Sequence, residues 1–429
     1  MDRIEITRAA RLSGEVTPPP DKSISHRAVM LSSLAKGRGI VRNFLRAQDT
    51  ESTMNAFRAL GVGIEDQGHT LIIEGKGLRG LTEPLDVIDC GNSGTTIRLI
   101  SGVLSANPFF SVLSGDSSLR SRPMARIIRP LSLMGAQISA RQGDKYAPLA
   151  IRGNDLSPIS YDMPVASAQV KSAILLAGLY TDGKTEVKEP SKSRDHTERM
   201  LPAFGADLTT DGLTVTVRGG RELFSQEIDV PADFSSAAFF MVAALLVPGS
   251  EVLIKNVGLN PTRTGLISVL QSMGAEITVS NERSVSGEPV GDISCRSAAA
   301  LRAATVTAEM VPSLIDEFPI LCVAAARAEG TTVIRGAEEL RVKESDRISA
   351  MAAELTKMGV RVEEFPDGLG ITGSDALRGA EVDSHGDHRI AMSMAVAGMT
   401  AEGVTGINNA SAVAISFPGF FSDMKRLSR

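Results

Sequence analysis

The sequence predicts a mixed α/β protein (α/β or α+β) in which similar supersecondary units follow one another. Three observations support this fold class: a short phrase containing glycine recurs five times, a helix that is apolar on nearly every face recurs six times, and strand-like segments stand between the helices. Internal repeats of this kind mark units that bury their apolar faces on their neighbours. The length of 429 residues suits about two to three domains of ordinary size.

The repeated phrase has the pattern apolar-x-x-apolar-Gly-(Ala/Val)-x-apolar. We interpret it as the end of an amphipathic helix, a glycine that caps it, and the entry into a strand. Its glycines stand roughly 70 residues apart, with one longer interval. The copies are Phe57–Ile64, Leu131–Ile138, Leu201–Leu208, Leu270–Ile277 and Leu355–Val362.

The helices that are apolar on nearly all faces should be buried. They are expected to begin near Ser23, Asn92, Ser167, Asp233, Ser313 and Asp387, with strands at segments such as Leu71–Glu74, Leu213–Val217 and Thr331–Arg335. If the units are equivalent, the polar N-terminal ends of these helices should meet at one face. Capping explains Ser, Asn and Asp at these ends, whereas Lys22, Arg27 and Arg389 are better explained by a bound anion.

The segment after Pro18-Pro19-Pro20 is the first candidate anion site. The prolines fix an extended chain, and Asp21 or Ser23 is then expected to cap a helix. Lys22, Ser23 and Arg27 would lie on its first turns, beside free N–H groups and the positive end of the helix dipole. This arrangement favours a phosphate. The alternative is a capped surface helix whose charges are solvated.

Composition excludes several classes of protein. The net charge is −5, Trp is absent and there are only three Tyr, so neither a general attraction for nucleic acid nor a stacking platform for bases is expected. No apolar run reaches the roughly 18 residues of a membrane span, and the N-terminus does not resemble a signal peptide. We expect no nucleic-acid or membrane partner.

The cysteines and histidines add two further expectations. Cys90, Cys295 and Cys322 are odd in number, far apart and outside any CxxC pattern, which suggests a reducing compartment and a cytoplasmic protein. The histidines, including His385 and His388, do not have the spacing of metal ligands. We therefore expect no metal and no cofactor.

Two glycine-rich segments match phosphate-binding patterns in the wrong context. Gly75–Gly80 matches GxGxxG, but Pro84 follows where a dinucleotide-binding fold needs a helix. Gly178–Thr185 matches the P-loop, but a helix precedes it and a strand follows. We interpret both segments as turns.

Other segments of the N-terminal half are better candidates. Gly91 and Gly94 open a buried helix and would let a ligand approach the backbone N–H groups closely, although a tight structural turn is the alternative. Arg122 could clamp a carboxylate or phosphate with two hydrogen bonds, although a solvated pair with Arg120 is the simpler interpretation. Arg194, at the start of the third amphipathic helix, could add another cation.

Carboxylates and cations recur at helix starts in the C-terminal half. Asp316 lies in apolar surroundings, where a carboxylate can cap a helix or act as a general base. Lys343 and Arg347 are expected to share a helix face as an i, i+4 pair, which is unfavourable without an anion. Asp387 and Arg389 repeat the pattern.

Proline stands just before a buried helix twice, at Pro18–Pro20 and at Pro231. The similarity predicts that the chain crosses between domains at both places, so the N-terminal strand should belong with the C-terminal half. The expected domains are 1–18 plus 233–429, which is discontinuous, and 19–232. Hinges are expected near 18–21 and 230–233.

These motifs, in this order over nearly the whole chain, resemble the 5-enolpyruvylshikimate-3-phosphate (EPSP) synthase family. They are Asp21–Arg27, Gly91–Arg98, Arg120–Pro123, Ser167–Gln169, Asp316–Pro319, Arg341–Arg347 and Asp387–Arg389. The resemblance implies a two-domain inverse α/β barrel of six βαβαββ-type repeats, three in each domain, with the active site in the interdomain cleft. It also implies a monomer that transfers the enolpyruvyl group of phosphoenolpyruvate to the 5-hydroxyl of shikimate 3-phosphate and releases phosphate.

The resemblance implies a role for each matching residue. Shikimate 3-phosphate would be held by Lys22, Ser23, Arg27, Ser167, Ala168, Gln169, Arg194, Asp316 and Lys343. Phosphoenolpyruvate would be held by Lys22, Gly94, Arg122, Gln169, Arg347 and Arg389. Asp316 would take the proton from the attacking hydroxyl, and either Lys22 or Glu344 would protonate the methylene carbon.

Two positions indicate the branch of the family. Ala168 replaces a second serine, and Ile415 stands where another branch has a lysine, so a cation for phosphoenolpyruvate is not expected from that segment. Gly94 leaves room for glyphosate, which is therefore a predicted inhibitor.

Two alternative functions remain. One is the sister UDP-N-acetylglucosamine enolpyruvyl transferase, which typically carries a cysteine near the arginine clamp; here no cysteine lies between Cys90 and Cys295. The other is a non-catalytic anion-binding repeat protein, against which the set of Asp316, Lys343 and Glu344 argues.

Overall fold

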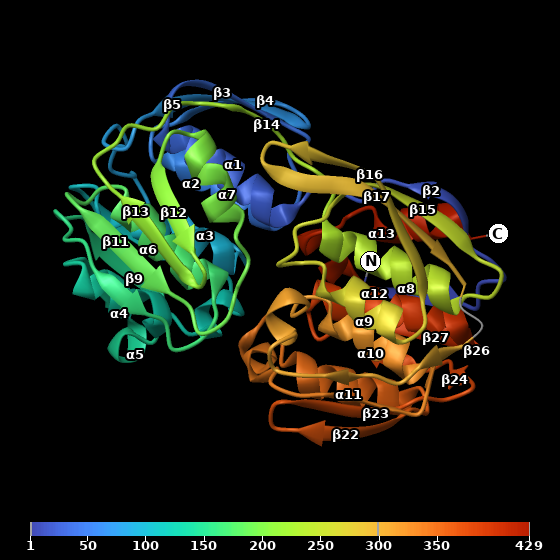
Figure 1. Cartoon of the computed structure of the whole chain (residues 1–429). Coiled ribbons are helices and arrows are strands. Elements are labelled where there is room, and N and C mark those ends of the chain that lie inside the picture. The colour runs from blue at the N-terminus through green and yellow to red at the C-terminus, as the bar shows by residue number, and fades with distance from the viewer. Residues whose placement is uncertain (1, 298–299, 429) are drawn as a thin grey trace. The chain divides into compact units, whose positions relative to one another are not determined.

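The computed structural model describes residues 2–297 and 300–428 (Figure 1). Met1 and Arg429, the outer bounds of the expected discontinuous domain, lie outside these residues. The chain divides into two compact units. Unit 1 contains Met1–Pro19, Pro231–Ser284 and Pro289–Arg429, and unit 2 contains Pro20–Val230 and Val285–Glu288. Each unit has its own hydrophobic core.

Unit 2 consists of three repeats of one pattern. The first has α1 (Lys22–Leu34), β3 (Lys36–Arg42), α2 (Gln48–Ala59), β4 (Gly63–Gln67) and β5 (Thr70–Lys76). The second has β6 (Ile88–Asp89), α3 (Gly94–Leu104), β7 (Phe110–Ser114), α4 (Ala125–Leu133), β8 (Gln137–Ala140), the short α5 (Arg141–Asp144) and β9 (Tyr146–Arg152). The third has β10 (Ser160–Asp162), α6 (Ala168–Gly178), β11 (Lys184–Lys188), α7 (His196–Ala203), β12 (Asp207–Asp211) and β13 (Thr214–Arg218), and β14 (Glu227–Asp229) then returns to pair with β3.

Unit 1 follows the same pattern. Its first repeat has α8 (Phe234–Leu246), β15 (Glu251–Gly258), α9 (Gly265–Ser272), β16 (Glu276–Val285) and β17 (Glu288–Arg296). The second has β18 (Leu301–Arg302), β19 (Thr305–Val306), α10 (Phe318–Ala326), β20 (Ala328–Glu329), β21 (Thr331–Ile334), α11 (Arg347–Lys357), β22 (Arg361–Phe365) and β23 (Gly368–Thr372). The third has β24 (Leu377–Arg378), β25 (Glu381–Asp383), α12 (His388–Thr400), β26 (Ala401–Glu402), β27 (Val404–Asn408) and α13 (Phe420–Leu427).

Within the described chain, six sheets share one topology, in which two parallel strands are followed by antiparallel partners. The orders are β14-β3-β5-β4, β6-β7-β9-β8, β10-β11-β13-β12, β2-β15-β17-β16, β19-β21-β23-β22 and β25-β27-β1. The N-terminal strands β1 (Arg3–Thr7) and β2 (Ser13–Val16) complete two sheets of unit 1 by pairing with β27 and β15. Both N-terminal strands therefore pair with strands of the C-terminal half of the chain.

The repeated phrase was interpreted correctly. Its five glycines, Gly61, Gly135, Gly205, Gly274 and Gly359, have φ between +86° and +102° and each stands two residues beyond the last residue of an amphipathic helix. Each is followed within two residues by a strand. A left-handed residue is what a helix needs in order to turn back into a strand, and glycine adopts it without steric cost.

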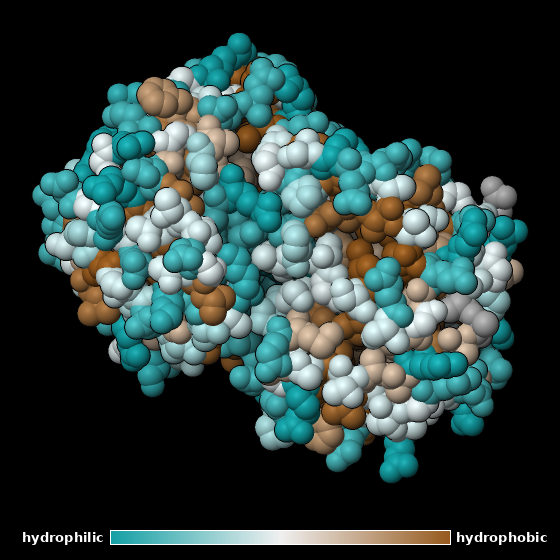
Figure 2. Space-filling model, viewed as in Figure 1, coloured by the Kyte–Doolittle hydropathy of each residue, from teal (hydrophilic) through white to brown (hydrophobic). Residues whose placement is uncertain are grey.

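The apolar helices are buried as expected. In unit 1, α8, α10 and α12 pack against one another, and Figure 1 shows them at the centre of that unit with the strands on its outside. Apolar residues also reach the surface. Figure 2 shows them as patches among polar residues on the visible face. The two glycine-rich segments that match phosphate-binding patterns are turns, as expected. The end of β5 leads into Gly75–Gly80, and no helix follows. Helix α6 leads through Gly178–Thr185 into β11. No helix in the described ranges is both long and apolar enough to cross a membrane.

Candidate active site

Three helices of unit 2 begin with predicted site residues. Asp21 caps α1 by accepting a hydrogen bond from the Ile24 N–H at 2.8 Å, which settles the choice between Asp21 and Ser23. Ser93 caps α3 and Ser167 caps α6 in the same way. Helix α3 packs against both α1 and α6. Lys22, Gly94 and Ala168 are therefore the first residues of three neighbouring helices, where free N–H groups and helix dipoles attract anions.

Lys22 and Arg27 are held in place by side chains from other helices. Lys22 Nζ lies 3.1 Å from Asp49 Oδ2 on α2. Arg27, which is 5% exposed, donates from Nε to Thr197 Oγ1 at 2.7 Å and from Nη2 to Ser172 Oγ at 2.9 Å. Burial lowers the pKa of Arg27 to about 10, which leaves it charged at neutral pH. A buried cation that bonds only to hydroxyls on these two nitrogens retains charge for an anionic ligand.

A second cation pair lies beside Gly94. A Cβ atom on Gly94 would stand 2.8 Å from Arg98 Nη1 and 3.3 Å from Arg122 Nη1. Arg98 donates to Gln169 Oε1 at 2.6 Å, and Arg122 donates to Asn92 Oδ1 at 2.5 Å. Two guanidinium groups thus face the backbone at the start of α3, and only glycine fits between them without a shift.

Arg98 contacts predicted site residues, although the sequence predicted no role for it. It is 7% exposed, and it links Gly94 on α3 with Gln169 on α6. The signal was present, because an arginine stands in the otherwise apolar run Gly94–Leu104. A buried arginine in such a run needs a partner or a ligand.

Ser167, Ala168 and Gln169 are half-buried around the start of α6. Gln169 donates from Nε2 to Thr95 Oγ1 at 3.0 Å, so it contacts α3 through both ends of its amide. Arg194 is half-buried in the segment that leads into α7, and its charge lies close enough to Arg27 to lower the pKa of that group. Unit 2 thus gathers its predicted cations around α1, α3 and α6.

In unit 1 the predicted carboxylates and cations form one network at the starts of α10, α11 and α12. Arg347, which is 1% exposed, pairs with Asp387 at 2.8 Å, with Glu344 at 2.7 Å and with Asp316 at 3.3 Å. Arg389 Nη2 lies 3.3 Å from Asp316 Oδ2. These neighbouring carboxylates raise the pKa of Arg347 above its ordinary value despite its burial.

The expected helical pairing of Lys343 and Arg347 is wrong. A 3₁₀ helix covers Glu338–Val342, Lys343 follows it in an extended conformation, and α11 begins only at Arg347. Asp346 caps α11 by accepting a hydrogen bond from the Ser349 N–H at 3.1 Å, which fixes the helix start there. Lys343 is still influenced by Asp316, Glu344 and Arg347, and burial lowers its pKa to about 8.

The helix expected near Ser313 also begins later. Ser313 ends a 3₁₀ turn, Val311–Ser313, and α10 starts at Phe318 with Pro319 in its first turn. Proline favours the first turn of a helix because its missing N–H has no partner there in any case. Asp316 therefore lies on the loop before α10. Ile415 is buried at the end of the 3₁₀ helix Ala410–Ile415.

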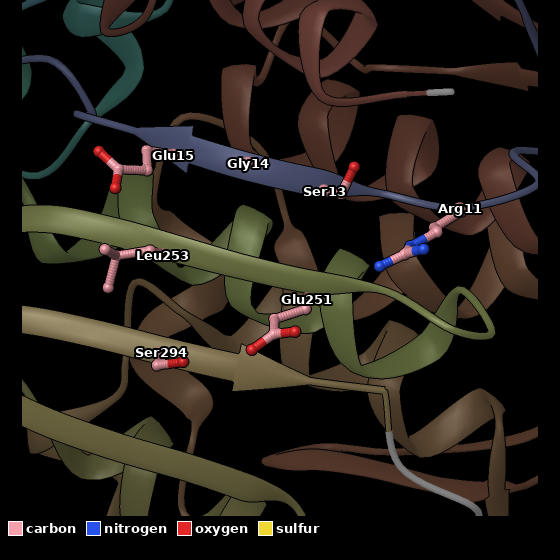
Figure 3. Close-up of a pocket in the computed structure, with 7 residues that line it drawn as sticks. All are labelled: Arg11, Ser13, Gly14, Glu15, Glu251, Leu253 and Ser294. Carbon is pink, nitrogen blue, oxygen red and sulfur yellow. The ribbon is translucent and has the colours of Figure 1, made fainter.

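A shallow pocket of unit 1 lies away from these groups. Figure 3 shows its lining on the neighbouring strands β2, β15 and β17, with Glu15 and Glu251 among the side chains. None of the residues predicted for the site lines it. The helix starts, in contrast, hold cations that can bind anionic groups, and two carboxylates, Asp316 and Glu344, that can accept or donate a proton.

Comparison with known proteins agrees with this chemistry. The family model described as EPSP synthase (3-phosphoshikimate 1-carboxyvinyltransferase) matches residues 6–424. A relative from Pelobacter propionicus named 3-phosphoshikimate 1-carboxyvinyltransferase is 58% identical over 426 residues, which are 99% of each chain. One of the same name from Geobacter metallireducens is 56% identical over 428 residues, 100% of each chain. A solved EPSP synthase from Acinetobacter baumannii has a TM-score of 0.89 and 46% identity, covering 100% of this chain and 98% of its own.

Proposed function

This chain belongs to the EPSP synthase family, and from this premise we propose how its residues share the reaction. The protein is a transferase of the shikimate pathway, which leads to the aromatic amino acids. It moves the enolpyruvyl group of phosphoenolpyruvate to the 5-hydroxyl of shikimate 3-phosphate, and the products are 5-enolpyruvylshikimate 3-phosphate and phosphate.

Shikimate 3-phosphate is bound mainly by residues of unit 2, with help from unit 1. Ser23, Arg27 and Arg194 offer hydroxyl and cationic groups, and the start of α6 offers Ser167, Ala168 and Gln169. Lys22, Asp316 and Lys343 complete the set. The support is chemical: Arg27 is a buried cation with hydroxyl partners at 2.7 and 2.9 Å, and a phosphate would place a negative charge beside it.

Phosphoenolpyruvate is bound by cations from both units. Lys22, Arg122, Gln169 and the backbone N–H of Gly94 come from unit 2, and Arg347 and Arg389 come from unit 1. Its phosphate and carboxylate match the bidentate geometry of arginine. Glyphosate competes for the same groups, and Gly94 leaves the room that it needs.

The proton transfers use Asp316 of unit 1 together with either Lys22 of unit 2 or Glu344 of unit 1. Asp316 removes the proton from the 5-hydroxyl as its oxygen attacks C2 of phosphoenolpyruvate, and Lys22 or Glu344 adds a proton to the methylene carbon. The positive charge that develops at C2 is stabilised by a nearby carboxylate. Phosphate then leaves, and loss of a proton from the methyl group restores the double bond.

The two units act as the two domains of a monomer, with hinges near 18–21 and 230–233. Their closure would exclude water from the reacting groups. Three buried free cysteines, Cys90, Cys295 and Cys322, suit the cytoplasm, where thiols stay reduced.

The observation that carries the assignment of the base is the position of Asp316 between Arg347 and Arg389, at 3.3 Å from each. An assay of phosphate release with shikimate 3-phosphate and phosphoenolpyruvate tests the assignment of Asp316 as the base. Asp316→Ala should lower kcat by about 100-fold or more, the scale of a general base. Turnover of Asp316→Ala at the wild-type rate would remove Asp316 from that role. UDP-N-acetylglucosamine in place of shikimate 3-phosphate should release no phosphate.

A further inference from the structure

Two side-chain contacts join helix α2 to helix α1. Lys22 and His26 stand four residues apart on α1, and Asp49 and Thr53 stand four residues apart on α2. Lys22 Nζ lies 3.1 Å from Asp49 Oδ2, and His26 Nδ1 lies 2.7 Å from Thr53 Oγ1. Residues four apart share a helix face, so the two pairs fix the register of the helices.

The same hydroxyl of Thr53 also contacts a side chain of helix α3. Thr53 Oγ1 lies 2.6 Å from Thr96 Oγ1, which donates to Ser93 Oγ at 2.7 Å. Ser93 Oγ also accepts from the Thr96 N–H at 3.1 Å and caps the helix that begins at Gly94. A continuous chain of hydrogen bonds therefore runs from α1, through α2, to the N-terminus of α3.

Every member of this chain is buried. His26, Thr53, Thr96 and Ser93 are each 0% exposed. Burial, with help from Lys22 and Arg27, lowers the pKa of His26 well below its ordinary value, so the ring is neutral. Each hydroxyl has one proton to give, and Thr96 gives its proton to Ser93, so Thr53 donates to Thr96 and the Nδ1–H of His26 donates to Thr53. Loss of the Thr53 hydroxyl would remove the partner of His26 Nδ1 on α1 and one of the hydrogen bonds of Thr96 Oγ1 on α3.

We infer that Thr53 is a positioning residue for the phosphoenolpyruvate end of the active site. Its side chain is 0% exposed, so it would act through the helices that it joins and not by touching a substrate. It holds the start of α3, with Gly94, in register with the start of α1, with Lys22. This inference rests on the proposed role of Lys22 and Gly94, because it is those two groups that Thr53 aligns.

The test is Thr53→Val, which keeps the shape of the side chain and removes the hydroxyl. The KM for phosphoenolpyruvate should rise about tenfold, equivalent to about 1.4 kcal/mol. The KM for shikimate 3-phosphate should rise less, because Gly94 is assigned to phosphoenolpyruvate alone whereas Lys22 is assigned to both substrates. Thr53→Ser keeps the hydroxyl and should restore the wild-type KM.

Thr185→Val is the matched control. Thr185 is also 0% exposed in unit 2, but its hydroxyl faces Thr181 at 3.5 Å, beyond the C-terminal end of α6. The Thr185→Val variant should lower the melting temperature of the protein, as Thr53→Val does, and should leave the KM values for both substrates unchanged. If Thr53→Val does not fold, Thr96→Val removes the same bond from the α3 side and should give the same selective rise.

Two results would overturn the inference: a KM for phosphoenolpyruvate that stays at the wild-type value, or equal rises in both KM values that Thr53→Ser does not reverse. Lys22→Ala separates this failure from that of the proposed site. If Lys22→Ala leaves the KM for phosphoenolpyruvate unchanged, the site assignment is wrong. If it raises that KM and Thr53→Val does not, only the role of Thr53 is wrong.

Discussion

The carboxylate of Asp316 accepts a hydrogen bond from Nη1 of Arg347 at 3.3 Å. Its other oxygen lies 3.3 Å from Nη2 of Arg389, so the proposed base is bound to both of the unit 1 arginines assigned to phosphoenolpyruvate. An anionic ligand that binds these arginines must compete with Asp316. The competition would release the base when the substrate arrives.

Asp316→Asn should therefore separate binding from turnover. We expect kcat to fall by about 100-fold or more, because the amide cannot take a proton. We also expect phosphoenolpyruvate to bind about tenfold more tightly, because a negative charge next to two arginines is removed. Calorimetric titration with phosphoenolpyruvate alone measures the second effect. Asp367→Asn, which changes a half-buried partner of Arg335, is the control and should alter neither value. Weaker binding to Asp316→Asn would contradict the competition.

Gly94→Ala should reduce inhibition by glyphosate. The new Cβ would stand 2.8 Å from Arg98 Nη1 and 3.3 Å from Arg122 Nη1, so the guanidinium of Arg98 must shift. The ratio of the inhibition constant to the KM for phosphoenolpyruvate should rise by about tenfold or more. Gly63→Ala is a suitable control, since its Cβ would meet only Glu74 at an ordinary 3.6 Å. Unchanged inhibition of Gly94→Ala would place the inhibitor elsewhere.

The pH dependence of kcat/KM for shikimate 3-phosphate should reveal the loss of charge on Lys343. Burial lowers its pKa from 10.5 to about 8, so it loses its charge as the pH rises through about 8. If Lys343 binds the phosphate of shikimate 3-phosphate, kcat/KM for that substrate should fall above pH 8. Lys343→Arg keeps its charge at this pH and should move the fall to higher pH. The same alkaline limb in wild type and Lys343→Arg would assign it to another group.

Lys343 should also affect the free energy of unfolding, which should rise with pH where kcat/KM falls. Between about 8 and 10.5 the folded Lys343 is neutral while the unfolded one still binds a proton. The free energy of unfolding contributed by this group therefore rises with pH across that window. Denaturant titrations of wild type and Lys343→Met at pH values on both sides of it would measure the difference, and a contribution of the opposite sign would contradict the shift.

The thiols should be unreactive in the folded protein. Burial raises the pKa of Cys295 to about 12 and raises those of Cys90 and Cys322 well above the ordinary value. Thiolates are the reactive form, so a thiol reagent should label these cysteines only in denaturant and leave the activity intact. Rapid loss of activity with one thiol labelled would instead indicate a reactive cysteine near the site, as in the sister enolpyruvyl transferase.

The buried ion-pair cluster of Lys171 should matter for stability. Lys171 Nζ lies 2.7 Å from Glu189 and 2.6 Å from Glu198, and its side chain is 0% exposed. Lys171→Met would leave two buried carboxylates together and should lower the free energy of unfolding by about 3–5 kcal/mol. Arg42→Met breaks an exposed pair with Glu227 and should cost at most about 1 kcal/mol. Equal effects in denaturant titrations would contradict the difference in burial.

Much of the fold was predictable because it depends on local patterns. The five glycines of the repeated phrase need only a helix end and a following strand, and all five have positive φ. The apolar helices needed only their composition. The resemblance added the family, which the comparisons bear out.

Local patterns failed where the chain is irregular. Lys343 and Arg347 have helical spacing, but the cap at Asp346 starts the helix after Lys343. Ser313 resembles a helix start, but Pro319 makes Phe318 the better one. In both cases the sequence offers more than one helix start, and the structure shows that the later one forms.

The sequence by itself determined the repeat, the burial of the helices, the chemical character of their N-termini and the family, because each of these follows from residue types at short spacing. Only the tertiary structure decided which groups are partners: Asp316 with Arg347 and Arg389, Arg98 with Gln169, and Thr53 with His26 and Thr96. These residues are between 27 and 73 positions apart within their pairs. Their contacts depend on how whole helices pack, and no local spacing encodes that packing.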